Sequence, residues 1–200
     1  MAISVVSLEE KRKELSNAGA PINPNARPFL SVLQKDELRK RMSAELIDCI
    51  KHKNVCGAVN AIKNGADVNA RDAFSRTALM LAVITDQTEL AMFLVKLGAS
   101  VNAADEFGQT PLMWASMSGN TELVKFLIEN GANVKAVDMH GCDALMMSIH
   151  GNKKTAQVLI NAGAEPKLTD ASGRSAIDRA KLMNKMDMVE LLTSYCYSEA

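Results

Sequence analysis

The 200-residue chain has few aromatic residues, few cysteines and no excess of charge of either sign. Its 23 Lys and Arg residues balance 23 Asp and Glu residues. This balance argues against duplex nucleic acid or an anionic membrane surface as the partner, because both need clustered positive charge. Hydrophobic residues make up 48% of the chain, which is enough for a packed core. With aromatics at 4% and 12 methionines, that core is expected to be mostly aliphatic.

The sequence also lacks an apolar run near the roughly 20 residues that cross a bilayer. Residues 1–6 lack the basic leader and long apolar segment of a secretory signal. The four cysteines form no CxxC pair, which is typical of free thiols in a reducing compartment. We therefore expect a cytoplasmic protein, with the nucleus as an alternative because of the short basic run at 38–41.

What is present is an internal repeat. Gly-Ala pairs begin at Gly65, Gly98, Gly131 and Gly163, with spacings of 33, 33 and 32 residues. Seven residues after each Gly comes an Asp: Asp72, Asp105, Asp138 and Asp170. Five residues later comes a good helix N-cap: Thr77, Thr110, Asp143 and Ser175. A fixed period with several positions in phase is the signature of a stacked repeat array.

Within one unit the pattern predicts two short helices. In the second unit we expect a helix over 111–117, a turn at Gly119-Asn120 and a helix over 122–129. The later helix has an apolar stripe at i, i+3 and i+4 spacing: Val124, Leu127 and Ile128. Neither helix is long enough to be stable alone in water, so the units are expected to stack on one another.

The best unit runs from Asp105 to Ala115 with Thr-Pro-Leu at 110–112, followed by Gly119-Asn120 and the segment 130–134. This unit resembles the ankyrin repeat. The resemblance extends over residues 43–193 and implies an all-α solenoid of stacked helix-turn-helix units with short hairpin-like loops. The family's His after Thr-Pro-Leu is replaced throughout, which predicts an apolar seam in its place. The replacements are Met80, Met113, Met146 and Asp178.

The repeat register divides the chain into an N-terminal extension at 1–42, a capping repeat at 43–70, and repeats at 71–103, 104–136, 137–168 and 169–200, the last with a C-terminal cap. The third repeat is one residue short, which predicts a shortened first helix or an altered turn at Ile149-His150. In the extension we expect a capped helix over 7–15, a linker marked by Pro21, Pro24 and Pro28, and a further helix over 30–42.

The family resemblance implies that a protein partner binds the concave surface formed by loop tips and first helices. We expect no enzyme activity, because such an array offers no enclosed cavity in which to desolvate a reacting group. We also expect a monomer with no cofactor and no metal. The candidate partner-binding residues are Phe74, Arg76, Glu106, Phe107, Gln109, Trp114, Met117, Met139, His140 and Cys142.

Several of these residues have two interpretations. Phe74 and Phe107 are either exposed contact residues or rings that lie against the neighbouring loop and stiffen the array. Trp114 either packs between repeats or buries its body while its N–H reaches the partner surface. Met139 and Cys142 would extend the apolar line of the two Phe residues to the third repeat.

Other constellations are weaker. Cys49, His52 and Cys56 have i, i+3, i+7 spacing, yet a turn is expected before Cys56 and no fourth zinc ligand is evident. The segment 140–143 holds His, Cys and Asp, but on an exposed loop without an oxyanion pocket. Asn102 resembles a site of asparaginyl hydroxylation in the family, or has a structural role in its loop.

The alternative function is an ankyrin-containing regulator or pathogen effector. In that case residues 1–42 would carry the targeting or activity-modulating segment, which folds on a partner.

Overall fold

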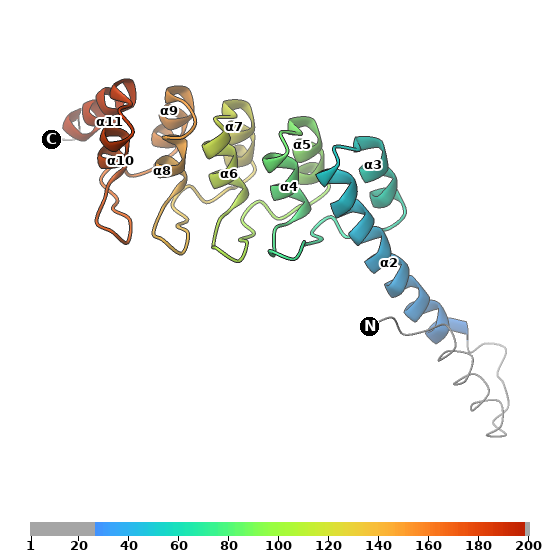
Figure 1. Cartoon of the computed structure of the whole chain (residues 1–200). Helices are drawn as coiled ribbons and strands as arrows, with labels where there is room; N and C mark the ends of the chain where they lie inside the picture. Colours follow the sequence, from blue (N-terminus) through green and yellow to red (C-terminus); the bar gives the residue numbers. More distant parts are fainter. Residues whose placement is uncertain (1–26, 199–200) are drawn as a thin grey trace. The chain divides into compact units, whose positions relative to one another are not determined.

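The computed structural model describes residues 27–198, and its contacts divide the chain into two units after Leu38. The described part contains helices and no strand. Figure 1 shows the pairs from α4–α5 to α10–α11 side by side in chain order, with their connecting loops extending to one side. The helices are α2 (Arg27–Lys51), α3 (Val55–Lys63), α4 (Ala78–Ile84), α5 (Thr88–Lys96), α6 (Pro111–Ser118), α7 (Thr121–Glu129), α8 (Ala144–Ser148), α9 (Lys153–Asn161), α10 (Ala176–Leu182) and α11 (Met186–Ser198). The expected all-α repeat architecture is confirmed.

The first helix of each repeat begins where the spacing predicts. The N-cap side chains accept hydrogen bonds from the third helical amide, at 3.2 Å for Thr77, 3.4 Å for Thr110 and 2.8 Å for Asp143. The fourth cap, Ser175, adds a reciprocal bond, because its own amide donates to the Asp178 carboxylate at 2.9 Å. These caps satisfy amides that a helix start leaves without partners.

The core is one continuous cluster that runs through the helix pairs of residues 39–200. Leu79, Leu112 and Leu145 occupy the same position in successive first helices and are fully buried. The three Met residues that replace the family's His are also fully buried, and Met113 and Met146 belong to the core cluster. Each helix pair therefore covers the apolar face of its neighbour, which makes stability depend on stacking.

The shortened third repeat has the expected consequence. Helix α8 has five residues and ends at Ser148, whereas α6 has eight residues. The turns after α2, α4, α6 and α10 each contain a residue with positive φ: Lys53, Asp86, Gly119 and Asn184. The turn after α8 contains no residue with positive φ, and this turn lies close to the preceding repeat. A Cβ on Gly151 would lie 2.4 Å from the Ser116 carbonyl oxygen.

One expectation for the N-terminal extension is wrong. Pro28 does not belong to a linker, because it lies in the first turn of α2. Proline is tolerated there because first-turn amides have no helical acceptor, and no Gly or Pro follows it before Lys51. The capped helix expected over 7–15, Pro21 and Pro24 lie outside the described residues, as does most of the segment to which the alternative function assigns targeting.

The buried cap Asp143 supplies a prediction about pH. Burial raises the pKa of the Asp143 carboxyl, and the charge of Glu165 adds to this, while backbone amides oppose it. A carboxyl whose pKa is higher folded than unfolded weakens the fold as the pH rises above the unfolded value, near 4. Asp143→Asn keeps the capping oxygen and removes the charge. We therefore expect the variant to melt above the wild type at pH 7 and level with it at pH 3.

Thermal melting by circular dichroism across this pH range measures the difference. Asp143→Ala is the control, because it removes the cap along with the charge and should lower stability by about 1 kcal/mol at pH 3. A constant difference between wild type and Asp143→Asn at every pH would contradict the prediction.

Candidate protein-interaction surface

Four loops precede the first helices, and we call them the finger loops: residues 71–76, 104–109, 137–142 and 169–174. In each loop the Asp at the second position accepts hydrogen bonds at its Oδ1 atom from the amides two and four residues later. In the second loop these bonds join Asp105 to Phe107 and Gln109, both at 2.9 Å. The other three loops repeat the arrangement at 2.8–3.1 Å.

Backbone hydrogen bonds also join neighbouring finger loops. The Glu106 amide donates to the Phe74 carbonyl at 3.3 Å, and the Met139 amide donates to the Phe107 carbonyl at 2.9 Å. The Ala171 amide donates to the His140 carbonyl at 2.8 Å. The loop tips are therefore held at fixed positions relative to one another before any partner binds.

The tips of the first three finger loops present apolar side chains to solvent. Phe74 is 51% exposed, Phe107 48% and Met139 63%. Each ring keeps about half of its surface in water. The Arg76 guanidinium lies over the Phe74 ring, 5.0 Å from its centroid, a contact worth about 0.5–1 kcal/mol at an exposed site.

Arg76 is engaged within its own loop. Its Nε and Nη2 atoms donate to Asp72 Oδ2 at 3.0 and 2.7 Å. Burial would raise the pKa of Asp72, but the bonds from the Arg76 side chain and from the Phe74 and Arg76 amides outweigh it and lower the pKa. Two of the five N–H donors of the Arg76 guanidinium thus serve the fold, and part of the side chain is exposed.

The remaining candidates differ in exposure. Glu106 and His140 are exposed, and Gln109 is half-buried. Trp114 and Met117 on α6 are half-buried and pack against the core. The Trp114 Nε1 atom is buried and has no hydrogen-bond partner within the described residues. The indole body therefore packs against the core, and its N–H is left unpaired within the described residues.

Cys142 corrects an expectation. It does not extend the apolar line at the loop tips, because it is only 3% exposed and its Sγ atom lies 2.9 Å from Arg179 Nη2. Cys142 occupies the same loop position as Arg76. The long side chain of Arg76 reaches solvent, whereas the short side chain of Cys142 is buried. Burial raises the pKa of the Cys142 thiol, which disfavours the nucleophilic thiolate. Asp143 is occupied as a helix cap.

The possible metal ligands and Asn102 have structural surroundings. His52 Nδ1 lies 2.9 Å from the Asp48 carbonyl oxygen, and Cys56 lies in the first turn of α3, after the turn that ends α2. Among the residues that the structure describes, no three His, Cys, Asp or Glu side chains gather as a metal site would require. Asn102 donates to the Gly131 carbonyl at 2.8 Å and accepts from the Asn133 amide at 2.7 Å, which links two successive loops.

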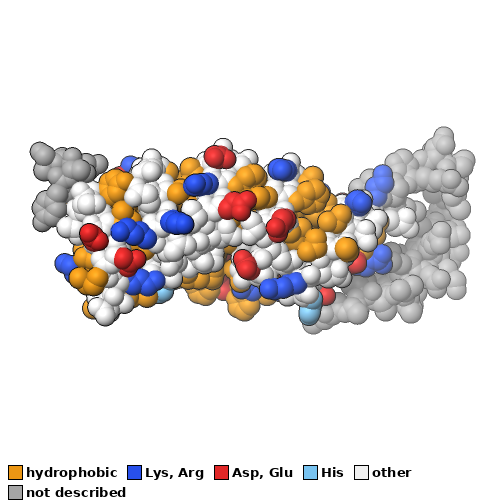
Figure 2. Space-filling model, turned by 90° about the horizontal axis from the view of Figure 1, so that it is seen from above, with side chains coloured by type: hydrophobic (Ala, Val, Ile, Leu, Met, Phe, Trp, Pro, Cys, Tyr) orange, Lys and Arg blue, Asp and Glu red, His pale blue; other side chains and the backbone are white. Residues whose placement is uncertain are grey.

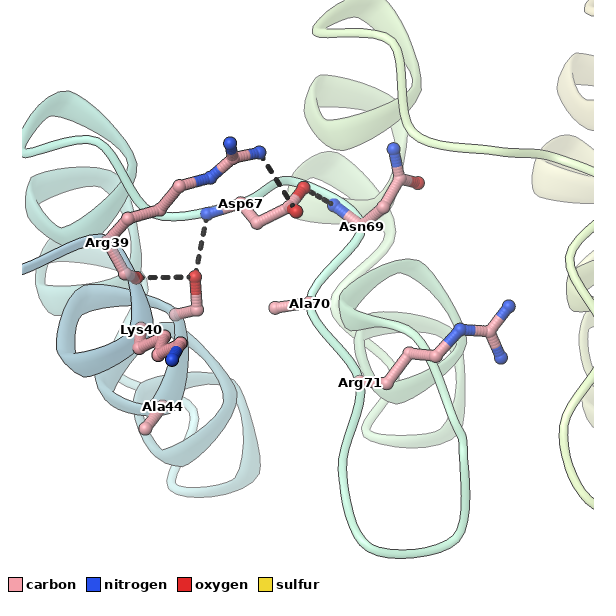
Figure 3. Close-up of a pocket in the computed structure, with 8 residues that line it drawn as sticks. Arg39, Lys40, Ala44, Asp67, Asn69, Ala70 and Arg71 are labelled. Atoms are coloured by element: carbon pink, nitrogen blue, oxygen red, sulfur yellow. Dashed lines mark hydrogen bonds and ion pairs between the residues drawn. The ribbon is translucent and has the colours of Figure 1, made fainter. Parts of the chain in front are cut away.

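A groove that the sequence pattern does not indicate lies beside the first finger loop (Figure 3). Its volume is about 460 Å³, and Arg39, Lys40, Ser43 and Ala44 line it opposite Asp67, Asn69, Ala70 and Arg71. An ion pair of 3.0 Å joins Arg39 to Asp67, whose amide donates to the Ser43 hydroxyl at 2.8 Å. The Arg39 guanidinium and the Asp67 carboxylate, which face each other across the groove, are thus already paired.

Charges are mixed on the molecular face that Figure 2 shows, with Lys and Arg side chains among Asp and Glu side chains. Within residues 27–198 no helix combines the length and apolar character needed to cross a membrane. The described surface also presents apolar tips on loops that are hydrogen-bonded to one another.

Comparison with known proteins agrees with this architecture. Residues 46–138 match the family model for ankyrin repeats in three copies. The ankyrin repeat and SAM domain-containing protein 6 of Rattus norvegicus is 40% identical to the chain over 199 residues. The match covers 96% of this chain and 18% of the rat protein, so the chain spans less than a fifth of that relative's length. Residues 46–138 are therefore ankyrin repeats, and the helix pairs that follow continue the same architecture.

Proposed function

We propose that the chain is a non-enzymatic protein-interaction module, an adaptor or scaffold whose partner binds the finger-loop tips and the first helices on the concave side of the array. The observation that carries this proposal is the row formed by Phe74, Phe107 and Met139. Phe74 and Phe107 occupy the same position in successive repeats, two residues after the loop Asp, and Met139 lies one residue after the Asp of the third loop. The three side chains are 48–63% exposed. Exposed aromatic side chains of this kind are enriched among residues that dominate binding energy.

The rigidity of the loops supports the same conclusion. Every tip is held by two bonds to its own Asp and by a backbone bond to a neighbouring loop. A preordered surface binds without the entropic cost of ordering loops, so a modest contact area gives useful affinity. Free thiols suit a reducing compartment, so a monomer in the cytoplasm or nucleus is part of this proposal.

The test is the double variant Phe74→Ala with Phe107→Ala. We expect it to reduce the recovery of partner proteins from native-cell extract at least tenfold, measured by affinity capture with quantitative mass spectrometry. The melting temperature should fall by only a few degrees, since both rings are about half exposed and the contact with Arg76 is lost from Phe74 alone.

The matched control is Phe93→Ala with Leu97→Ala. These two apolar side chains are exposed to a similar degree, but they lie on and just after the second helix α5. The control should capture the same partners as the wild type. Equal capture by both double variants and the wild type would contradict the proposed surface, and unfolding of the Phe74/Phe107 variant would show that the rings are structural.

A further inference from the structure

The finger-loop aspartates differ in the partners of their Oδ2 atoms, and the second loop stands apart in this respect. In the first loop, Asp72 Oδ2 accepts from Arg76 at 2.7 and 3.0 Å, with Lys51 Nζ at 3.4 Å. In the fourth loop, Asp170 Oδ2 accepts from Arg179 at 2.6 and 3.1 Å. The Arg174 amide and the Arg179 guanidinium lower the pKa of Asp170 to about 2.

Asp105 Oδ2 has no such donor. Asp105 is 8% exposed, and this oxygen is fully buried without a hydrogen-bond partner in the part of the chain that the structure describes. The residue at the Arg76 position is Gln109, and the residue at the Arg179 position is Trp114. A buried carboxylate oxygen without a donor is unfavourable, and natural folds rarely retain one.

The third loop lacks an arginine of its own, but the charge of its Asp138 interacts with Arg179, which follows the fourth loop. Burial opposes the charge on Arg179, yet its bonds to Asp170 raise its pKa, and the nearby charge of Asp138 in the third loop adds to this. The second loop has no equivalent neighbour, because the residue of the third repeat in the register of Arg179 is Met147.

The surroundings of Asp105 are acidic. Residues 97–124 contain Asp105, Glu106 and Glu122 and no Lys or Arg, which makes the net charge of this segment −3. The basic side chains of the preceding loop are occupied: Arg76 binds Asp72, and Arg71 donates to the Ala104 carbonyl at 2.8 Å. The segment 97–124 therefore supplies no cation of its own to neutralise Asp105.

We propose that Asp105 is the subsite for a lysine or arginine side chain of the protein partner, placed between the apolar contacts of Phe74 and Phe107. This inference rests on the proposed function and adds the chemistry of the partner: a basic residue flanked by apolar ones. The first loop shows the geometry. There the guanidinium of Arg76 fills the position beside the carboxylate while 25% of its side chain remains exposed, so this position is open to solvent on one side.

In the second loop the partner's cation takes the place of the half-buried Gln109 side chain, which moves to another rotamer. Trp114 occupies the repeat position of Arg179, whose side chain bonds to Asp170 of its own loop. The unpaired N–H of Trp114 is a donor for a backbone carbonyl of the same bound segment. The second repeat thus offers an acceptor for the partner's basic side chain and a donor for the partner's backbone.

The test is selection of random twelve-residue peptides by display on the full chain. Peptides that lose binding to the Phe74→Ala, Phe107→Ala double variant define the proposed surface. We expect these peptides to be enriched in Lys or Arg at one position. Replacing that residue of the peptide with Gln should weaken its binding to the wild-type protein at least tenfold. The same replacement should not weaken binding to the Asp105→Asn variant, which keeps the Oδ1 acceptor and loses the charge. The single Trp114 indole N–H signal in NMR spectra should shift on binding.

A second variant works in the opposite direction. Gln109→Arg supplies the guanidinium that Arg76 gives the first loop, so it should raise the melting temperature by a few degrees and abolish the enrichment in basic residues. Gln109→Met, of similar length and without charge, is the matched control and should do neither. This pair remains informative even if Asp105→Asn is unstable.

The outcomes separate the two proposals. If no selected peptide depends on Phe74 and Phe107, the proposed surface is wrong. If peptides depend on the two rings but show no preference for Lys or Arg, and Gln109→Arg changes neither stability nor selection, the surface stands and the Asp105 subsite is wrong.

Discussion

The Gly151→Ala variant is expected to be less stable than the wild type by about 3 kcal/mol, because its Cβ has no room. The atom would lie 2.4 Å from the Ser116 carbonyl oxygen and 2.8–2.9 Å from the Gly119 backbone. These neighbours are backbone atoms at the end of α6, so relief requires moving one repeat away from the next. The cost arises from the short third repeat, whose turn lies against the preceding one.

Gly131→Ala is the matched control. Gly131 has φ of +85° and open space where the alanine methyl group would stand, so alanine there meets conformational strain without a clash. We expect a loss of about 1–2 kcal/mol from that strain. Urea denaturation followed by circular dichroism measures both variants. Equal losses at the two positions would show that the contact between the α6 and α8 turns yields easily, against our expectation.

Leu112→Ala is expected to cost about 2–5 kcal/mol, since it leaves a cavity in the middle of the core. Leu112 is 1% exposed on α6, which contacts both α4 and α8. The loss should therefore weaken two interfaces between repeats at once. Leu182→Ala is the control: that side chain is 70% exposed at the end of α10, and its removal should change stability by less than about 0.5 kcal/mol.

Denaturation monitored by Trp114 fluorescence suits this pair, because the single tryptophan reports on the same helix as Leu112. A Leu112→Ala midpoint equal to that of Leu182→Ala would mean that α6 is held mainly by its caps and turns rather than by apolar packing.

Much of the repeat fold can be predicted from the sequence, because local rules and global packing agree in this chain. The caps Thr77, Thr110, Asp143 and Ser175 mark helix starts through side-chain chemistry that requires no tertiary context. The missing residue of the third repeat likewise indicates the short helix α8. Pro28 misleads because proline marks both linkers and helix starts.

The details of the surface are harder to predict, because they depend on how far a side chain reaches. Cys142 and Arg76 occupy equivalent positions, yet one is buried and the other partly exposed, a difference of side-chain length. The unpaired state of Asp105 emerges only when all four loops are compared in three dimensions, since Arg179 reaches Asp170 from nine residues away. A signal is nonetheless present: Gln109 stands where the first and fourth loops carry arginine.

The backbone bonds between adjacent finger loops, together with the stacking of each helix pair only on its neighbours, have a consequence for how the array opens. Every interior repeat is held from both sides, whereas in the described part of the chain α11 packs mainly on α10 and α9. Fraying is therefore expected to start at the terminal pairs and progress inward. Amide hydrogen exchange should be slowest in α6 and α8 and faster in α3 and α11, so that the loops with exposed Phe107 and Met139 are the last to lose their spacing.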